Sequence, residues 1–450
     1  MSPKADPEVV VIGAGIAGLS TSYHFGHDGC RVFEANPYYG GHLHTRIEDG
    51  FVWDEGPHIS FTKSEYVRQL FAESVEGDYR EFDVRVGNYF KGSWIDHPAQ
   101  TNLYQIPEPL RSRCIESFLQ SRPLAGRAEA PANYREWLHR SLGPVFADTF
   151  PAAYTRKYWT TEPENMTIDW VGSRMYTPSV EQVRAAARGP LEHSTYYITT
   201  ARYPERGGFI EFTKKLAEGA RIEYGKRLVN IHFGDRRLGF ADGTIAHYDV
   251  LASTIPLPTL LGAAEDAPDS VKEAATRLRC SELLAVNVAA AHPSRRPETY
   301  FYVYDEDKYA TRVTIVENLS SHNTPPDTTG LQVEVYGSAY RPLPTDHEAV
   351  ARRVAAELVE MGVVDGHDAV ISVNATYVPW ANVIFDHDRR PALKAVNGFL
   401  DEVGVLRAGR YAEWKYMWTD GCVLSGRNVA QKLRGGDEPA AMRQRPHSVP

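Results

Sequence analysis

The sequence predicts an α/β fold in which a Rossmann-like unit, assembled from separated segments, is combined with a helical part and an antiparallel sheet. Three observations support this class. The run EVVVIGAG, residues 8–15, is β-branched and ends in glycines, which is typical of a buried parallel strand leading into a tight turn. Residues 108–188 carry helical patterns, whereas the chain from Tyr203 onward returns to strand patterns.

The opening unit is a β-α-β motif built around Gly13, Gly15 and Gly18. Residues 16–27 have apolar side chains at helical spacing, and the strand that follows ends at Glu34. In such a motif the first glycine permits the turn, the second lets a pyrophosphate approach, and the third lets the helix pack on the strand. The helix N-terminus favours phosphates, and Glu34 is placed to accept a hydrogen bond from a ribose hydroxyl. The motif therefore predicts a dinucleotide site.

The remaining elements follow in order along the chain. Helical patterns occupy residues 108–119, 133–150 and 180–188, and a loop rich in Pro, Ala and Gly separates the first two. Among the later strand patterns, residues 347–362 have alanines and valines at 3.6 spacing and predict an amphipathic helix. The tail from Arg434 lacks apolar periodicity and is predicted to be disordered.

Composition excludes several classes of partner. The chain has 450 residues and a net charge of −9, so we expect neither nucleic acid nor an anionic membrane as a partner. No apolar stretch approaches the about 18 residues of a membrane span, and the N-terminus lacks signal-peptide features, so a cytoplasmic location is predicted. The four cysteines show no C-x-x-C spacing and predict reduced thiols without a metal.

A second glycine pair, Gly40 and Gly41, lies just past the second strand. It resembles the glycine doublet of the flavoprotein superfamily that contains amine oxidases, protoporphyrinogen oxidase and UDP-galactopyranose mutase. Two distant segments are similar as well. The strand around Val229 resembles the family's return strand, whose backbone meets the adenine, and Gly409 with Arg410 resembles its C-terminal flavin segment. The resemblance implies FAD, held noncovalently, with NADPH as a candidate reductant.

The same resemblance implies a division of the chain. The FAD-binding domain would draw on three segments that are far apart in the sequence, and the substrate would lie against a mainly helical domain. The expected bounds are residues 1–95, 203–290 and 372–433 for the FAD-binding domain, 96–202 for the helical substrate domain, 291–371 for an antiparallel sheet with a helix, and 434–450 for the tail.

Further segments resemble the eukaryotic-type mutases in the same order. WDEGPHISFTK, residues 53–63, resembles the mobile histidine loop that covers the flavin, and HPAQTN, residues 97–102, resembles a Tyr-Pro-Phe-Gln-Asn stretch. YTRKYW and DWVGSR, residues 154–159 and 169–174, resemble the substrate-domain pattern of a tryptophan under the nucleoside and an arginine on the diphosphate. The resemblance implies catalytic roles for His58, Arg174 and Arg312, and substrate contacts from Gln100, Trp159, Arg174, Tyr302, Arg312 and Tyr416.

These residue types suit a nucleotide sugar. Guanidinium groups bind phosphate oxygens bidentately, so Arg174 and Arg312 could converge on one diphosphate from two parts of the chain. In mutase-like chemistry, as the resemblance implies, the reduced flavin N5 attacks the anomeric carbon and the nucleotide diphosphate leaves. The protein then supplies orientation and charge stabilisation. No Ser/His/Asp or Cys/His arrangement is found in the sequence.

Plain structural roles stay open for several of these residues. Trp159 and Tyr416 could be packing residues, His58 a loop histidine, and Arg174 a helix-surface residue paired with an acid. Three positions also depart from the mutase pattern. Phe385 lacks the hydroxyl of a family tyrosine, and Thr155 and Ile198 stand where the family has asparagines.

The leading hypothesis is an FAD-dependent nucleotide-sugar mutase that interconverts pyranose and furanose rings without net oxidation. The alternative is an FAD-dependent oxidase or dehydrogenase of the protoporphyrinogen or amine oxidase type, acting on a small molecule. A third hypothesis is a non-enzymatic protein that binds a flavin and has a structural or sensor role. The sequence leaves the sugar, the base, the reductant and the oligomeric state undetermined.

Overall fold

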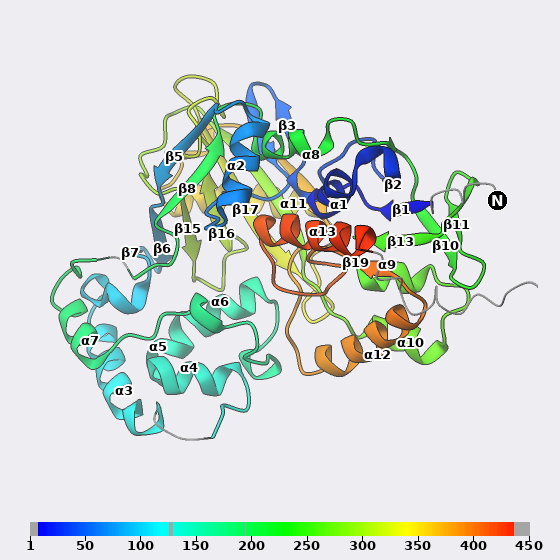
Figure 1. The fold of residues 1–450 in the computed structure, drawn as a ribbon. Coiled ribbons are helices and arrows are strands. Elements are labelled where there is room, and N and C mark those ends of the chain that lie inside the picture. Colours follow the sequence, from blue (N-terminus) through cyan, green and yellow to red (C-terminus); the bar gives the residue numbers. More distant parts are fainter. Residues whose placement is uncertain (1–7, 126–128, 194, 436–450) are drawn as a thin grey trace, which may run out of the picture.

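The computed structural model describes residues 8–125, 129–193 and 195–435. Figure 1 shows a helical lobe next to a larger body that contains the sheets, and the two share one buried apolar core. The α/β class predicted from the sequence is confirmed. The final helix, α13 (Thr419–Arg434), includes the residue at which the disordered tail was expected to begin, and residues 436–450 of that tail lie outside the described residues.

A five-stranded parallel sheet carries the opening motif. Its central strand, β1, is buried along its whole length because it is paired on both sides, which explains its unbroken run of β-branched residues. Helix α1 (Ile16–Phe25) follows β1 directly and packs against α13, where the Ser20 hydroxyl donates to the Val423 carbonyl oxygen at 2.6 Å. The strand order is β19 (Leu406–Arg407), β13 (Val250–Ser253), β1 (Val9–Ile12), β2 (Cys30–Phe33) and β9 (Ile222–Glu223).

A seven-stranded sheet forms the second layer. Its strands pair antiparallel, except that β15 and β6 run parallel. The order is β18 (Val370–Val378), β14 (Glu282–Ala290), β17 (Thr329–Gly337), β16 (Arg312–Ile315), β15 (Tyr300–Val303), β6 (Val86–Phe90) and β7 (Ser93–Asp96).

Smaller sheets join these layers. The three-stranded antiparallel sheet comprises β10 (Leu228–His232), β11 (Arg237–Phe240) and β12 (Ile245–His247). The two hairpin-like pairs are β3 (Thr45–Glu48) with β4 (Phe51–Asp54), and β5 (Tyr79–Asp83) with β8 (Thr200–Pro204).

The seven-stranded sheet draws strands from more than one of the expected domains. Strands β6, β7, β14 and most of β18 were expected in the FAD-binding domain, yet they belong to the seven-stranded sheet. The reason is that a buried apolar run looks the same in the sequence whether its neighbours run parallel or antiparallel.

The helices begin and end on recognisable signals. Asn133, Ser179 and Asp346 each cap a helix by accepting a hydrogen bond from a backbone N–H in its first turn. The helical lobe contains α3 (Leu110–Ala125), α4 (Tyr134–Leu142), α5 (Pro144–Thr149), α6 (Pro151–Tyr158) and α7 (Val180–Ala186). The other helices besides α1 and α13 are α2 (Glu65–Ser74), α8 (Lys214–Ala217), α9 (Leu257–Gly262), α10 (Asp269–Thr276), α11 (His347–Glu360) and α12 (Arg389–Glu402).

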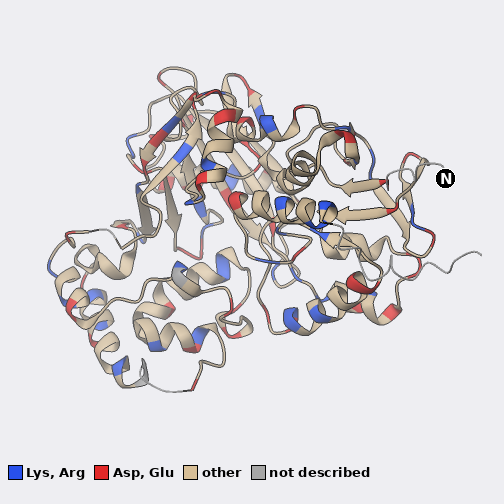
Figure 2. Cartoon of the chain, in the orientation of Figure 1, with Lys and Arg blue, Asp and Glu red and all other residues tan. Residues whose placement is uncertain are grey.

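Acidic and basic residues are interspersed along both parts of the molecule (Figure 2). In the described part of the chain, no helix is both long and apolar enough to cross a bilayer.

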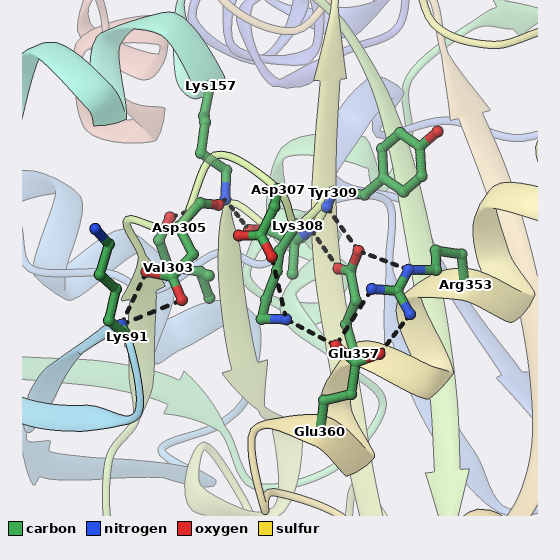
Figure 3. Close-up of polar contacts among 11 residues, drawn as sticks. Lys91, Lys157, Val303, Asp305, Asp307, Lys308, Tyr309, Arg353, Glu357 and Glu360 are labelled. Atoms are coloured by element: carbon green, nitrogen blue, oxygen red, sulfur yellow. Dashed lines mark hydrogen bonds and ion pairs between the residues drawn. The ribbon is translucent and has the colours of Figure 1, made fainter.

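The turn between β15 and β16 is anchored by a buried lysine of the helical lobe (Figure 3). The Lys157 ammonium donates to the carbonyl oxygens of Val303, Asp305 and Ala310 at 3.0, 2.7 and 2.6 Å. From the opposite side, the Glu357 carboxylate of α11 accepts from the backbone N–H groups of Tyr309 and Ala310. Burial lowers the pKa of Lys157 to about 7, against the opposing effect of the nearby carboxylates. The strands on both sides of this turn are therefore held at a fixed distance from α6.

Lys157→Met should destabilise the protein, because it removes the ammonium donor from three buried carbonyl oxygens, of which that of Asp305 keeps the Lys308 backbone N–H at 3.3 Å. A buried group left unsatisfied costs about 1–3 kcal/mol, so we expect a clearly lowered melting temperature in thermal unfolding. Lys91→Met is the matched control, since the Lys91 side chain is exposed and only its backbone N–H binds Asp305. A melting temperature of Lys157→Met equal to that of the control would contradict this role.

Candidate functional site

One cavity of about 850 Å³ is lined by residues of the parallel sheet, the seven-stranded sheet and the helical lobe. Two sets among its lining residues bear directly on ligand binding. The glycine part comprises Gly13, Gly15, Glu34, Gly40 and Gly41. The aromatic part comprises Tyr154, Tyr158, Trp159, Trp170, Tyr196, Tyr300, Tyr302, Tyr336, Tyr416 and Trp418.

The glycine part has the shape of a dinucleotide cradle. Glu34 accepts from the backbone N–H groups of Ala14 and Asn36, each at 2.8 Å, and this fixes the carboxylate beside the turn. A Cβ at Gly18 would lie 1.9 Å from the Gly13 carbonyl oxygen, so this glycine is required by the contact between helix and turn.

Gly15 differs from Gly18 because the protein itself leaves room there. A Cβ at Gly15 would meet only the Gly41 Cα, at 4.0 Å. Gly15 also precedes the first turn of α1, whose free N–H groups favour a phosphate. A side chain at this position would therefore stand in the cavity, so the residues present fit a pyrophosphate-containing cofactor.

The C-terminal segment completes this part of the cavity. Gly409 has a φ of +91°, and a Cβ there would lie 2.6 Å from the Ala17 side chain. Arg410 lines the cavity and donates from Nε to the Met417 carbonyl oxygen at 2.7 Å.

The Val229 side chain does not line the cavity. It lies on β10 between two inward-facing positions and is 48% exposed, whereas Arg227, two residues earlier, lines the cavity. The expectation from the sequence was that the backbone around Val229 meets the adenine, and the alternation of side chains along the strand directs the Val229 side chain to solvent.

The expected substrate residues gather in one place. Gln100, Trp159, Tyr302 and Tyr416 all line the cavity, as do the two arginines. Trp159 lies 5.1 Å from Trp170 and 5.9 Å from Tyr416 between ring centroids. These aromatic rings offer stacking faces, with hydroxyl groups at the edges of the tyrosines.

Arg174 approaches the cavity without a carboxylate partner in the described part of the chain. One Nη donates to the Trp170 carbonyl oxygen at 2.6 Å. The guanidinium carbon stands 4.4 Å from the centroid of the Tyr416 ring and 5.0 Å from that of Trp418. Its Nε is buried and makes no hydrogen bond to any described residue. The positive charge is thus left available to an anion.

Arg312 is different, because it is paired with an acid that sequence reasoning missed. Its Nη2 and Nε lie 2.8 and 2.5 Å from the carboxylate of Glu334, directly opposite on β17. Glu334 is buried and also lines the cavity. An acidic residue inside the apolar run LQVEVYG was the signal that could have indicated it.

His58 lies on the cavity wall as a neutral group. Burial and, to a smaller extent, the nearby Arg410 lower the pKa of His58 to about 3. Its Nδ1 is buried and has no hydrogen-bond partner among the described residues. Gly56, with a φ of +93°, permits the turn that places the histidine there.

The three departures from the mutase pattern have different surroundings. Thr155 and Ile198 line the cavity, and the Thr155 hydroxyl donates to the Pro151 carbonyl oxygen at 2.7 Å. Phe385 is buried beneath the Arg389 guanidinium at 4.2 Å and does not line the cavity. Phe385 is therefore a packing residue.

The described residues contain neither a metal-binding cluster nor a thiol of lowered pKa. No three His, Cys, Asp or Glu side chains gather there to hold a metal ion. The cysteines are free, and burial raises the pKa of Cys114 and of Cys280 to about 12. A thiol with so high a pKa is a poor nucleophile at neutral pH.

The fold and this cavity fit a protein that binds a dinucleotide cofactor, and comparison with known proteins gives the family. The model of the flavin-containing amine oxidoreductase family matches residues 16–434. The chain belongs to this family, whose members hold FAD.

The individual proteins that resemble this chain share little sequence identity with it. A zeta-carotene-forming phytoene desaturase of Myxococcus xanthus is 26% identical over 258 residues, which is 53% of this chain and 46% of that relative. The crystal structure of a reduced UDP-galactopyranose mutase is similar with a TM-score of 0.89 and 22% identity, covering 95% of this chain and 96% of the other. An enzyme assigned as a protoporphyrinogen oxidase, from Exiguobacterium, has a TM-score of 0.72 and 18% identity, covering 95% and 99%. At these identities the structures establish a shared fold.

Gly15→Leu should abolish flavin binding, because the side chain would fill the cavity without disturbing the protein around it. We expect a folded, colourless protein by absorbance and thermal unfolding. Gly398→Leu is the control, since a Cβ there also meets nothing within 4 Å but lies on α12, outside the cavity. Full flavin content in Gly15→Leu would contradict the assignment of the cradle.

Proposed function

We propose that the protein is an FAD-dependent nucleotide-sugar mutase that interconverts pyranose and furanose rings without net oxidation. The observation that carries this proposal is the cavity itself, which joins a dinucleotide cradle to an aromatic part containing an uncompensated arginine. The similarity to a UDP-galactopyranose mutase over 95% of the chain supports the same function.

The cofactor would be held by the glycine part of the cavity, together with Gly409 and Arg410. FAD would be bound noncovalently, and NADPH is a candidate reductant. When bound, a flavin supplies a centre that can act as a nucleophile or transfer a hydride. The chain's own residues bind and orient the substrate beside it.

The diphosphate would lie between Arg174 and Arg312. Arg174 supplies an unpaired charge, whereas Arg312 shares its charge with Glu334 and would contribute a directed hydrogen bond rather than net attraction. Tyr302 and Tyr416 would donate hydroxyl hydrogens, and Trp159 and Gln100 would contact the nucleoside. His58, being neutral, would shape the cavity beside the flavin without repelling a cationic transition state.

The alternative function is an FAD-dependent oxidase or dehydrogenase acting on a small molecule. The aromatic lining favours it, because an apolar substrate would fit the same rings. The phytoene desaturase and the enzyme assigned as a protoporphyrinogen oxidase support it through the shared family and fold.

Redox stoichiometry separates the two functions. With reduced flavin, a mutase should convert many substrate molecules for each reducing equivalent supplied and consume no oxygen in proportion to product. Anaerobic turnover of UDP-sugars, followed by chromatography of the products, measures this directly. In a parallel assay in air, oxygen uptake equal to product formation would replace the mutase with the oxidase.

Arg174→Ala should weaken UDP binding about ten- to a hundredfold, because a charge-assisted hydrogen bond contributes about 1.5–3 kcal/mol. Titration of the flavin-loaded protein with UDP, followed by flavin absorbance, gives the dissociation constant. Arg390→Ala is the matched control, since Arg390 is exposed and pairs with Asp169 away from the cavity.

For Arg312, the double variant Arg312→Met/Glu334→Gln avoids leaving a buried carboxylate alone. We expect it to weaken binding less than Arg174→Ala does. Unchanged affinity in Arg174→Ala would exclude the diphosphate role.

A further inference from the structure

His97 lies on the cavity wall beside the expected substrate residues, at the start of the turn that also carries Gln100. Its ring is 4.7 Å from the Tyr196 ring and 5.0 Å from the Tyr302 ring between centroids. The backbone N–H of His97 donates to the Val86 carbonyl oxygen at 3.0 Å, so the residue is anchored to the edge of the seven-stranded sheet.

A buried asparagine fixes the hydrogens of this ring. Asn88 is fully buried on β6, and its Nδ2 donates to the Ile95 carbonyl oxygen at 3.1 Å. Because a carbonyl oxygen only accepts, the amide NH₂ group must face Ile95 and the amide oxygen must face His97. The Asn88 Oδ1 lies 3.1 Å from the His97 Nδ1, so that nitrogen must carry the hydrogen.

The ring is also kept neutral. Burial lowers the pKa of His97 to about 3, and no nearby charge among the described residues opposes that shift. A neutral ring with its hydrogen on Nδ1 has an unprotonated Nε2, which can only accept a hydrogen bond. The described residues provide no hydrogen bond to Nε2, and the side chain borders the cavity.

A fixed acceptor restricts what can lie opposite it. A phosphate oxygen would be repelled, because both atoms present lone pairs. An O–H or N–H group of a ligand would be bound. The neighbouring Gln100 has its own Nε2 committed to the Tyr176 carbonyl oxygen at 3.0 Å, so its amide oxygen adds a second acceptor on the same turn.

We propose that His97 is a specificity-determining residue whose Nε2 accepts a hydrogen bond from the nucleoside of the substrate. The inference rests on the proposed nucleotide-sugar function and deepens it. The donor is either a ring or exocyclic N–H of the base or a hydroxyl of the ribose, and the enzyme selects nucleotides that present it. Asn88 is the positioning residue that holds the ring in its accepting form.

The test is a coupling experiment on the flavin-loaded protein. UDP, GDP, ADP and CDP are first titrated into the wild type to find the tightest ligand. That nucleotide is then compared with its 2′-deoxy analogue and with the analogue methylated at the base's donor nitrogen, in the wild type, His97→Phe and His97→Gln. Flavin content and melting temperature report the folding of each variant, and His97→Leu replaces His97→Phe should that variant lose its flavin.

We expect one analogue to bind the wild type about tenfold more weakly than the parent nucleotide. His97→Phe should bind the parent nucleotide more weakly than the wild type by about the same factor. The parent nucleotide and the analogue should then bind this variant with equal affinity. His97→Gln should restore much of the discrimination, because its amide oxygen can stand in for Nε2. The methylated analogue identifies the base as the donor, and the 2′-deoxy analogue identifies the ribose.

Two results would overturn the inference. If His97→Phe binds the parent nucleotide like the wild type, or discriminates against the analogue equally well, His97 does not read the nucleoside, and the mutase proposal is unaffected. If the wild type binds none of the four nucleotides, both the proposed function and the role of His97 fall.

Discussion

Close approach of backbone to backbone at the start of α1 is the constraint on which the rest of the structure depends. A Cβ at Gly18 would meet the Gly13 carbonyl oxygen at 1.9 Å, and one at Gly426 would meet the Ala17 carbonyl oxygen at 2.5 Å. Because these two positions are glycines, the turn before α1 and the helix α13, which come from opposite ends of the chain, can both pack closely against α1. The same closure leaves the backbone at Gly15 and Gly41 facing the cavity, where a cofactor phosphate needs to approach.

Charge is distributed unevenly between the surface and the cavity. The chain carries a net charge of −9, yet within the described residues Arg174 and Arg410 line the cavity without forming an ion pair with a carboxylate. An unpaired guanidinium among aromatic rings is partly stabilised by their faces, and it remains available to a ligand anion. Arg312 and Glu334 form an ion pair, so together they carry no net charge, but the Arg312 guanidinium still offers directed hydrogen-bond donors. The cavity therefore combines the unpaired positive charges of Arg174 and Arg410 with aromatic rings and hydroxyl groups.

The helical lobe and the seven-stranded sheet, which both line the cavity, are joined to each other by buried hydrogen bonds. Lys157, on the same helix as Tyr154 and Tyr158, binds the turn that connects the strands bearing Tyr302 and Arg312 (Figure 3). Glu357 closes the same turn from α11. The spacing between the helical wall and the sheet wall is thus set by buried backbone hydrogen bonds, which tolerate little displacement.

The sequence by itself determined the local features of this protein. Gly13, Gly15, Gly18 and Glu34 predicted the cradle, because a dinucleotide turn needs those residue types at that spacing, and helical periodicity predicted most of the lobe. Only the tertiary structure decided the pairings between distant segments: Glu334 opposite Arg312, Asn88 against His97, and Lys157 under a turn almost 150 residues away. It also assigned β6, β7 and β14 to the seven-stranded sheet and turned Val229 outward. The physical reason is that periodicity records whether a side chain is buried, whereas the partner it meets depends on strand order and register, which are set by contacts far apart in the chain.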